Sequence, residues 1–104
     1  MPVSFIYITT KDKAEARRIG RELVESRLAA CVNVIDSVNS TYWWKDKVQD
    51  EAEAVLIAKT KDSLAGEVIA KVKSLHSYTC PCVVVLPVLD GNPDFLKWVE
   101  DETR

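Results

Sequence analysis

The only histidine of the chain and two of its three cysteines lie close together, at His76, Cys80 and Cys82. One imidazole and two thiolates are soft ligands that suit Cu(I) or Zn(II). If Cys80 and Cys82 begin a strand, both side chains leave it on one face, because side chains alternate along a strand. The cluster therefore predicts a site for copper or another divalent cation, although C-x-C is a much less specific spacing than paired C-x-x-C motifs.

Each of these residues also has a structural interpretation. Free cysteine is among the most often buried residue types, and the apolar run that follows Cys82 is typical of a core strand. His76 comes at the expected end of a helix, where an imidazole caps the last carbonyl groups. Cys31, beside two alanines, is expected in a core or an interface. For all of them the residues alone leave both interpretations open.

Other kinds of chemistry have little support, so we expect a protein that is not an enzyme. No motif places a third group to orient a Cys–His pair, and the three glycines are isolated rather than grouped in a phosphate loop. Glu51 and Glu53 alternate onto one strand face, which we expect to be solvated. A net charge of −2 provides no basic excess for nucleic acid.

The hydropathy pattern and the cysteine count indicate a compartment. No apolar run approaches the ~18 residues that a membrane span needs, and the N-terminus enters a strand pattern without a signal peptide. An odd number of cysteines favours reduced thiols over a disulfide framework. We therefore predict a cytoplasmic protein with no membrane partner.

The elements that must position these residues alternate between strand and helix patterns. Apolar strands are expected at residues 3–9 and 82–88, and helices at 12–27, 62–75 and from Pro93 onward. Gly20, inside the apolar stripe of the first helix, implies close packing on a sheet. The order predicts one α+β domain over residues 1–104: a ferredoxin-like βαββαβ sandwich with a short C-terminal helix.

Between the first helix and the second lies a long hairpin, residues 30–60, with its turn at Lys45-Asp46. Its arms far exceed the usual strand length of about 5–6 residues, so its tip must project from so small a domain. In its first arm the apolar residues in phase run from Ala30 to Trp44, with a bend or bulge expected at residues 35–37. A projecting tip with Tyr42, Trp43 and Trp44 would expose apolar side chains on unpaired strand edges, which tend to associate with other chains. We therefore expect the tip to pack on another copy of the chain.

Several short motifs, taken together, make the chain recognisable: Ala29-Ala30-Cys31-Val32-Asn33, Ser40-Thr41-Tyr42-Trp43-Trp44, Lys59-Thr60, His76-x-Tyr78-x-x-Pro81, Gly91-Asn92 and Leu96-x-Trp98. They cover the whole chain in order and resemble the CutA divalent-cation tolerance family. The resemblance implies a tight homotrimer, similar in architecture to the PII signalling proteins, that binds copper or other divalent cations with no obligatory cofactor.

Our hypothesis for the metal site is a cleft between protomers in which His76 is a ligand, helped by Cys80 or Cys82. The residues expected at the trimer interface or in its cleft are Cys31, Asn33, Tyr42, Trp43, Trp44, Lys59, Tyr78 and Trp98.

The chain departs from the family pattern in three places. Ser77, Thr79 and Cys82 replace a proline and two glutamates, Asp46 replaces a glycine of the hairpin turn, and Thr9 or its neighbour replaces a cysteine. The lost carboxylates disfavour hard cations.

The alternative function is a PII-like signalling or scaffold trimer that binds a small molecule or a protein in the cleft.

Overall fold

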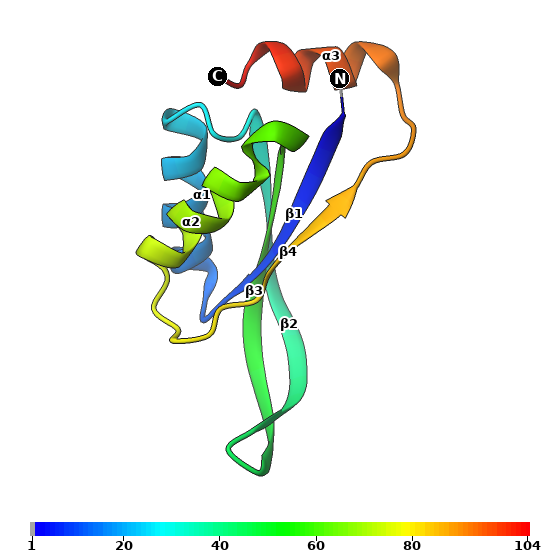
Figure 1. Ribbon diagram of the computed structural model, residues 1–104. Helices are drawn as coiled ribbons and strands as arrows, with labels where there is room; N and C mark the ends of the chain where they lie inside the picture. The colour runs from blue at the N-terminus through cyan, green and yellow to red at the C-terminus, as the bar shows by residue number, and fades with distance from the viewer. Residues whose placement is uncertain (1) are drawn as a thin grey trace.

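The computed structural model describes residues 2–104 as four strands and three α-helices around one antiparallel sheet. The elements are β1 (Val3–Thr10), α1 (Lys13–Glu25), β2 (Cys31–Trp44), β3 (Lys47–Lys61), a 3-10 turn (Asp62–Leu64), α2 (Ala65–Leu75), β4 (Val83–Pro87) and α3 (Pro93–Asp101). The strand order is β2-β3-β1-β4, and α1 and α2 lie together on one side of the sheet (Figure 1). The predicted βαββαβ fold with a long hairpin and a C-terminal helix is confirmed.

Local signals in the sequence explain where the helices begin. The carboxylate of Asp12 accepts a hydrogen bond from the backbone N–H of Glu15 at 2.8 Å and caps α1. Asn92 caps α3 in the same way, ahead of Pro93 in the first turn. None of the helices within residues 2–104 is long and apolar enough to cross a bilayer.

The core lies between the helices and one face of the sheet. Ile6 and Ile8 of β1 and Leu56 of β3 are fully buried against Ile19 of α1 and Val68 of α2. Antiparallel pairing aligns Ile8 with Leu56, so these side chains fall on the same face. The opposite face carries no helix from α1 or α2, and the apolar Val84 and Leu86 of β4 are about half exposed there.

A β-bulge lies where the sequence indicated it. The pairing of β2 with β3 shifts between Ile35 and Val38, so that Asp36 and Ser37 together oppose the single residue Ala54. Ser37 has a left-handed φ of 74°. The extra residue reverses which side chains of β2 face the helices. Val32 and Val34 pack on the core, whereas Val38, Tyr42 and Trp44 fall on the open face. The prediction that all five share one face is wrong for this reason.

The hairpin extends beyond the body of the protein, as Figure 1 shows. Its turn is the predicted pair Lys45-Asp46, and both residues have the left-handed φ that a tight two-residue turn requires. The longest dimension of the protomer is 44 Å and its radius of gyration is 14.1 Å, against about 13 Å for a compact domain of this length. Trp43, paired with Val48 near the tip, is 73% exposed.

Two glycines in helices provide a matched test of the packing. A Cβ at Gly20 would lie 2.9 Å from Cγ2 of Val32 and 3.0 Å from Cδ1 of Leu56, which confirms the close approach inferred from the sequence. A Cβ at Gly66 would meet no atom of residues 2–104 within 4 Å, beyond its own helix and chain neighbours. We expect Gly20→Ala to lower the free energy of unfolding by about 1 kcal/mol or more, because the clash exceeds the gain in helix propensity.

Gly66→Ala is the control, and we expect it to raise the free energy of unfolding by about 0.5–1 kcal/mol. Urea denaturation at one protein concentration measures both variants. Equal stabilisation by the two alanines would show that α1 does not pack against β2 and β3 as described.

Candidate functional site

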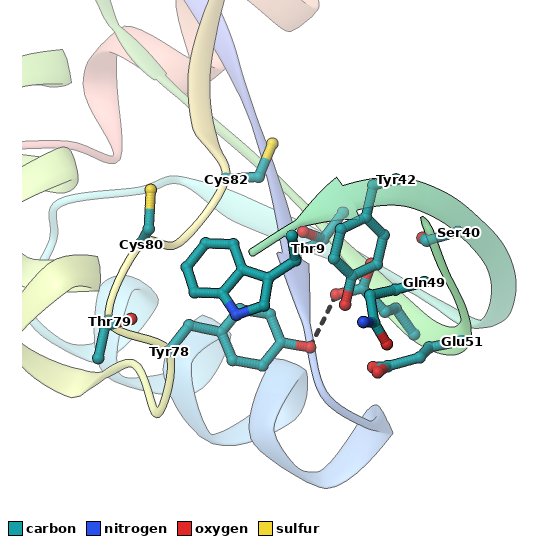
Figure 2. A pocket seen from close by; sticks show the side chains of 11 residues that line it. Thr9, Ser40, Tyr42, Gln49, Glu51, Tyr78, Thr79, Cys80 and Cys82 are labelled. Atoms are coloured by element: carbon teal, nitrogen blue, oxygen red, sulfur yellow. Dashed lines mark hydrogen bonds between the residues drawn. The ribbon is translucent and has the colours of Figure 1, made fainter. Parts of the chain in front are cut away.

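A cavity of about 540 Å³ opens between the hairpin and the connector that joins α2 to β4. Figure 2 shows that the side chains from the hairpin and those from the connector face each other across it. It is lined by Thr9 of β1, by Ser40, Tyr42, Trp44, Gln49, Glu51 and Glu53 of the hairpin, and by Tyr78, Thr79, Cys80 and Cys82 of the connector.

The hairpin wall of the cavity is one face of the paired strands. Tyr42 pairs with Gln49 and Ser40 with Glu51, so residues two apart on each strand project into the same space. The predicted alternation of β3 is confirmed, and Glu51 is exposed as expected, but the expectation that Glu53 is also solvated is wrong. Glu53 is only 8% exposed, because the connector covers it.

Tyr78 ties the two walls together. Its hydroxyl donates to a carboxylate oxygen of Glu53 at 2.7 Å. Burial, this hydrogen bond and the charge of Glu53 raise the pKa of Tyr78 well above its ordinary value. Loss of solvation, followed by the charge and hydrogen bonding of Glu51, raises the pKa of Tyr42. Both phenols therefore remain protonated donors at neutral pH.

His76 holds the start of the connector. Its side chain is fully buried, its Nε2 lies 2.7 Å from the carbonyl oxygen of Thr9, and its Nδ1 accepts from the backbone N–H of Tyr78 at 3.0 Å. This pattern requires the neutral tautomer that carries its proton on Nε2. The ring packs on that of Tyr78, with 4.7 Å between centroids. Both ring nitrogens are thus engaged, and neither has a lone pair directed at a cation.

Glu15, which the sequence analysis did not single out as a site residue, completes this anchor from α1. Its carboxylate accepts from the backbone N–H groups of Lys11 and Ser77 at 3.1 and 3.0 Å, and lies 4.0 Å from Nδ1 of His76. Burial raises the pKa of Glu15, but the hydrogen bonds from Ser77 and Lys11 outweigh it, and the net pKa is lowered. The only signal in the sequence was an acidic residue in the first turn of α1.

Cys80 and Cys82 are both exposed free thiols on the connector. β4 begins at Val83, one residue later than predicted, so both cysteines precede the strand. The interpretation of these two residues as core cysteines is wrong for the protomer. Within residues 2–104, no three or more His, Cys, Asp and Glu side chains are grouped closely enough to hold a metal ion. Since His76 points away into the anchor, the predicted set of His76, Cys80 and Cys82 does not form one coordination site within a protomer.

The remaining predicted residues fall into two further places. Lys59 lies on the open face of the sheet, where its ammonium donates to the side chain of Asn33 and lies 5.6 Å from the ring centroid of Phe5. Cys31 pairs with Lys59 across β2 and β3. Trp98 of α3 lines a smaller hollow near Arg27, away from the cavity. Of the predicted interface residues, only Tyr42, Trp44 and Tyr78 line the cavity.

The anchor predicts a pH-dependent stability. Because the pKa of Glu15 is lowered in the folded protein, its carboxylate contributes stability that is present above its ordinary pKa of 4.5. This contribution is lost as the pH falls through the lowered folded value. We expect Glu15→Gln to reduce the free energy of unfolding by about 1–3 kcal/mol at neutral pH. The difference from wild type should shrink in acid.

Denaturant titrations at about pH 7 and about pH 3 measure this difference. Glu22→Gln is the control, since Glu22 is half exposed, and a surface pair of this kind contributes under about 1 kcal/mol. A Glu15→Gln penalty that is as large in acid as at neutrality would contradict the assignment.

Known proteins resemble this chain over its whole length. The family model described as CutA1 divalent ion tolerance protein matches residues 4–102. The divalent-cation tolerance protein CutA of Archaeoglobus fulgidus is 41% identical over 98 residues, which cover 94% of this chain and 95% of that protein. Chloroplastic CutA 1 of rice is 38% identical over 104 residues, all of this chain but only 59% of the rice protein.

Solved structures agree with the fold. The crystal structure of rice CutA1 superposes with a TM-score of 0.97 at 38% identity and covers 100% of this chain and 95% of that one. The structure of the periplasmic divalent cation tolerance protein CutA from A. fulgidus gives a TM-score of 0.93 at 40% identity, covering 96% and 97% of the two chains. The match of the family model to residues 4–102, together with relatives of about 40% identity, shows that this chain belongs to the CutA1 divalent ion tolerance protein family.

Proposed function

We propose that the chain works as a homotrimer in which the hairpin of each protomer packs on a neighbour. The supporting observation is the tip, where Trp43 and Val48 pair across the strands and remain largely exposed. The half-exposed Val84 and Leu86 of β4 add apolar surface on the open face, and β2 and β4 are both edge strands of the sheet. Exposed apolar edges of this kind are normally covered. The number three is the expectation from the family resemblance.

We further propose that the trimer binds copper ions or a divalent cation as its cargo and so contributes to metal-ion tolerance. The single observation that supports this function is a pair of exposed thiols, Cys80 and Cys82, beside a cavity that also contains Glu51 and Glu53. Two thiolates suit Cu(I), which soft ligands select. His76 then has a positioning role: through its bond to the N–H of Tyr78 it holds the connector that carries both thiols.

A binding role also accounts better for the side chains than catalysis does. The hydrogen bonds of His76 go to Thr9 and Tyr78, so the imidazole is not set to take a proton from either thiol.

The three free cysteines favour a reducing compartment, and we propose the cytoplasm. The alternative, a PII-like signalling or scaffold trimer, is favoured by the size of the cavity, which falls in the usual range for small-molecule sites of about 300–1,000 Å³.

The assembly is tested by light scattering on the purified chain. We expect a mass three times that of the 11.7 kDa chain. Trp43→Ser should weaken association, because it removes the largest exposed apolar side chain of the tip. Leu89→Ser is the control, since Leu89 is equally apolar and 94% exposed but lies outside the hairpin. A monodisperse monomer for the unmodified chain at micromolar concentration would rule the trimer out.

The metal site is tested by titrating reduced protein with Cu(I) and Zn(II) against a chromophoric competitor. We expect the double variant Cys80→Ser, Cys82→Ser to lose Cu(I) affinity by about 100-fold or more, while Cys31→Ser binds as wild type does. His76→Gln retains a donor for the carbonyl of Thr9 and should weaken binding by about tenfold, the low end of the loss typical for a residue that only positions the ligands. Wild-type affinity in the double variant, or an equal loss in His76→Gln, would refute the assignment.

A further inference from the structure

We propose that the same cavity is a binding site for organic ammonium cations, held by the rings of Tyr42, Trp44 and Tyr78 and by the carboxylates of Glu51 and Glu53. The inference goes beyond metal binding. It depends on the rings and carboxylates of the cavity lining and not on its two thiols, so it holds or fails independently of the copper proposal.

The first argument is charge. The cavity lining contains two glutamates and no lysine, arginine or histidine. The two phenols stay neutral, because the pKa values of Tyr42 and Tyr78 are raised. The cavity therefore has a formal charge of −2 from Glu51 and Glu53 at neutral pH. A phosphate or carboxylate ligand would face like charges without a cationic partner, whereas a cation is attracted.

The second argument is the kind of cation. Apart from Cu(I), which two thiolates suit, a small metal ion needs three or more ligands converging at about 2–2.5 Å, and among residues 2–104 no three or more His, Cys, Asp and Glu side chains are grouped to supply them. Three aromatic residues, Tyr42, Trp44 and Tyr78, line the cavity instead, and the face of such a ring binds an alkylated ammonium group through cation–π contact. Such a cation carries its charge over a larger surface. Carboxylates at contact distance then add attraction without having to coordinate it.

The third argument is preorganisation. Tyr42 and Glu51 project from neighbouring positions of the paired strands, and Figure 2 shows both on the hairpin side of the cavity, across from Tyr78. On the opposite wall, the Tyr78 hydroxyl is fixed by its 2.7 Å bond to Glu53, and its backbone by His76. Rings and carboxylates held in place before binding lose little entropy when a ligand enters.

The test uses reduced full-length protein in a metal chelator, with tetramethylammonium as the probe and tert-butanol as its neutral counterpart of similar shape. Proton NMR of the probe's methyl groups reports binding, because aromatic rings shift those signals upfield. We expect saturable binding of tetramethylammonium and at least about tenfold weaker binding of tert-butanol. Equal binding of the two probes, or none of tetramethylammonium, would overturn the inference.

Variants then identify the site. We expect Glu51→Gln and Trp44→Leu each to weaken tetramethylammonium binding at least about fivefold. Glu67→Gln, the same exchange on the exposed surface of α2, should leave binding unchanged. The double variant Cys80→Ser, Cys82→Ser should also retain the probe while losing Cu(I), which separates this inference from the metal proposal. Wild-type binding in both Glu51→Gln and Trp44→Leu would place the probe elsewhere and refute the site.

Discussion

The β-bulge at Asp36 and Ser37 is the constraint on which the rest of the site depends. Side chains of a strand alternate with a period of two, so one extra residue exchanges the two faces of everything beyond it. Before the bulge, Val32 and Val34 serve the core. Beyond it, the residues of the same parity project to the open side and form the hairpin wall of the cavity. Without the bulge, Tyr42 and Trp44 would face away from Glu51 and Tyr78, and Thr41 and Trp43 would lie on the cavity side in their place.

The connector wall depends on a different kind of interaction, a buried polar anchor. A buried carboxylate is costly unless its hydrogen bonds are supplied, and Glu15 receives two from backbone N–H groups. His76 uses one nitrogen for Thr9 of β1 and the other for Tyr78. These bonds tie a segment without regular secondary structure to α1 and β1, both of which belong to the rigid core. Cys80 and Cys82 therefore lie on a connector whose first residues are held in place by these hydrogen bonds.

Much of the fold was predictable because its signals are local. The apolar stripe of α1, the turn at Lys45-Asp46 and the bulge at residues 35–37 each depend on a few neighbouring residues, and all are confirmed. The site was less predictable because it depends on contacts between distant segments. Glu53 looked solvated until Tyr78, 25 positions away, was seen to cover it. The imidazole of His76 has the chemistry of a metal ligand, but its Nε2 is already hydrogen-bonded to the carbonyl oxygen of Thr9, 67 positions away.

The alternation of side chains along the hairpin places the cavity on one face and the proposed assembly surface on the other. Trp43 and Trp44 are adjacent in the chain, yet they lie on opposite faces of the hairpin: Trp44 lines the cavity, whereas Trp43 pairs with Val48 on the other side. One two-stranded ribbon therefore has a polar and aromatic face that lines the cavity and, on its other face, the exposed apolar pair that we propose to pack on a neighbouring copy. Because both faces share the same backbone, packing of the tip on another protomer would also restrict the motion of the strands that carry Tyr42 and Glu51. Assembly would then rigidify the hairpin wall, and the cavity would be better formed in the oligomer than in a lone chain.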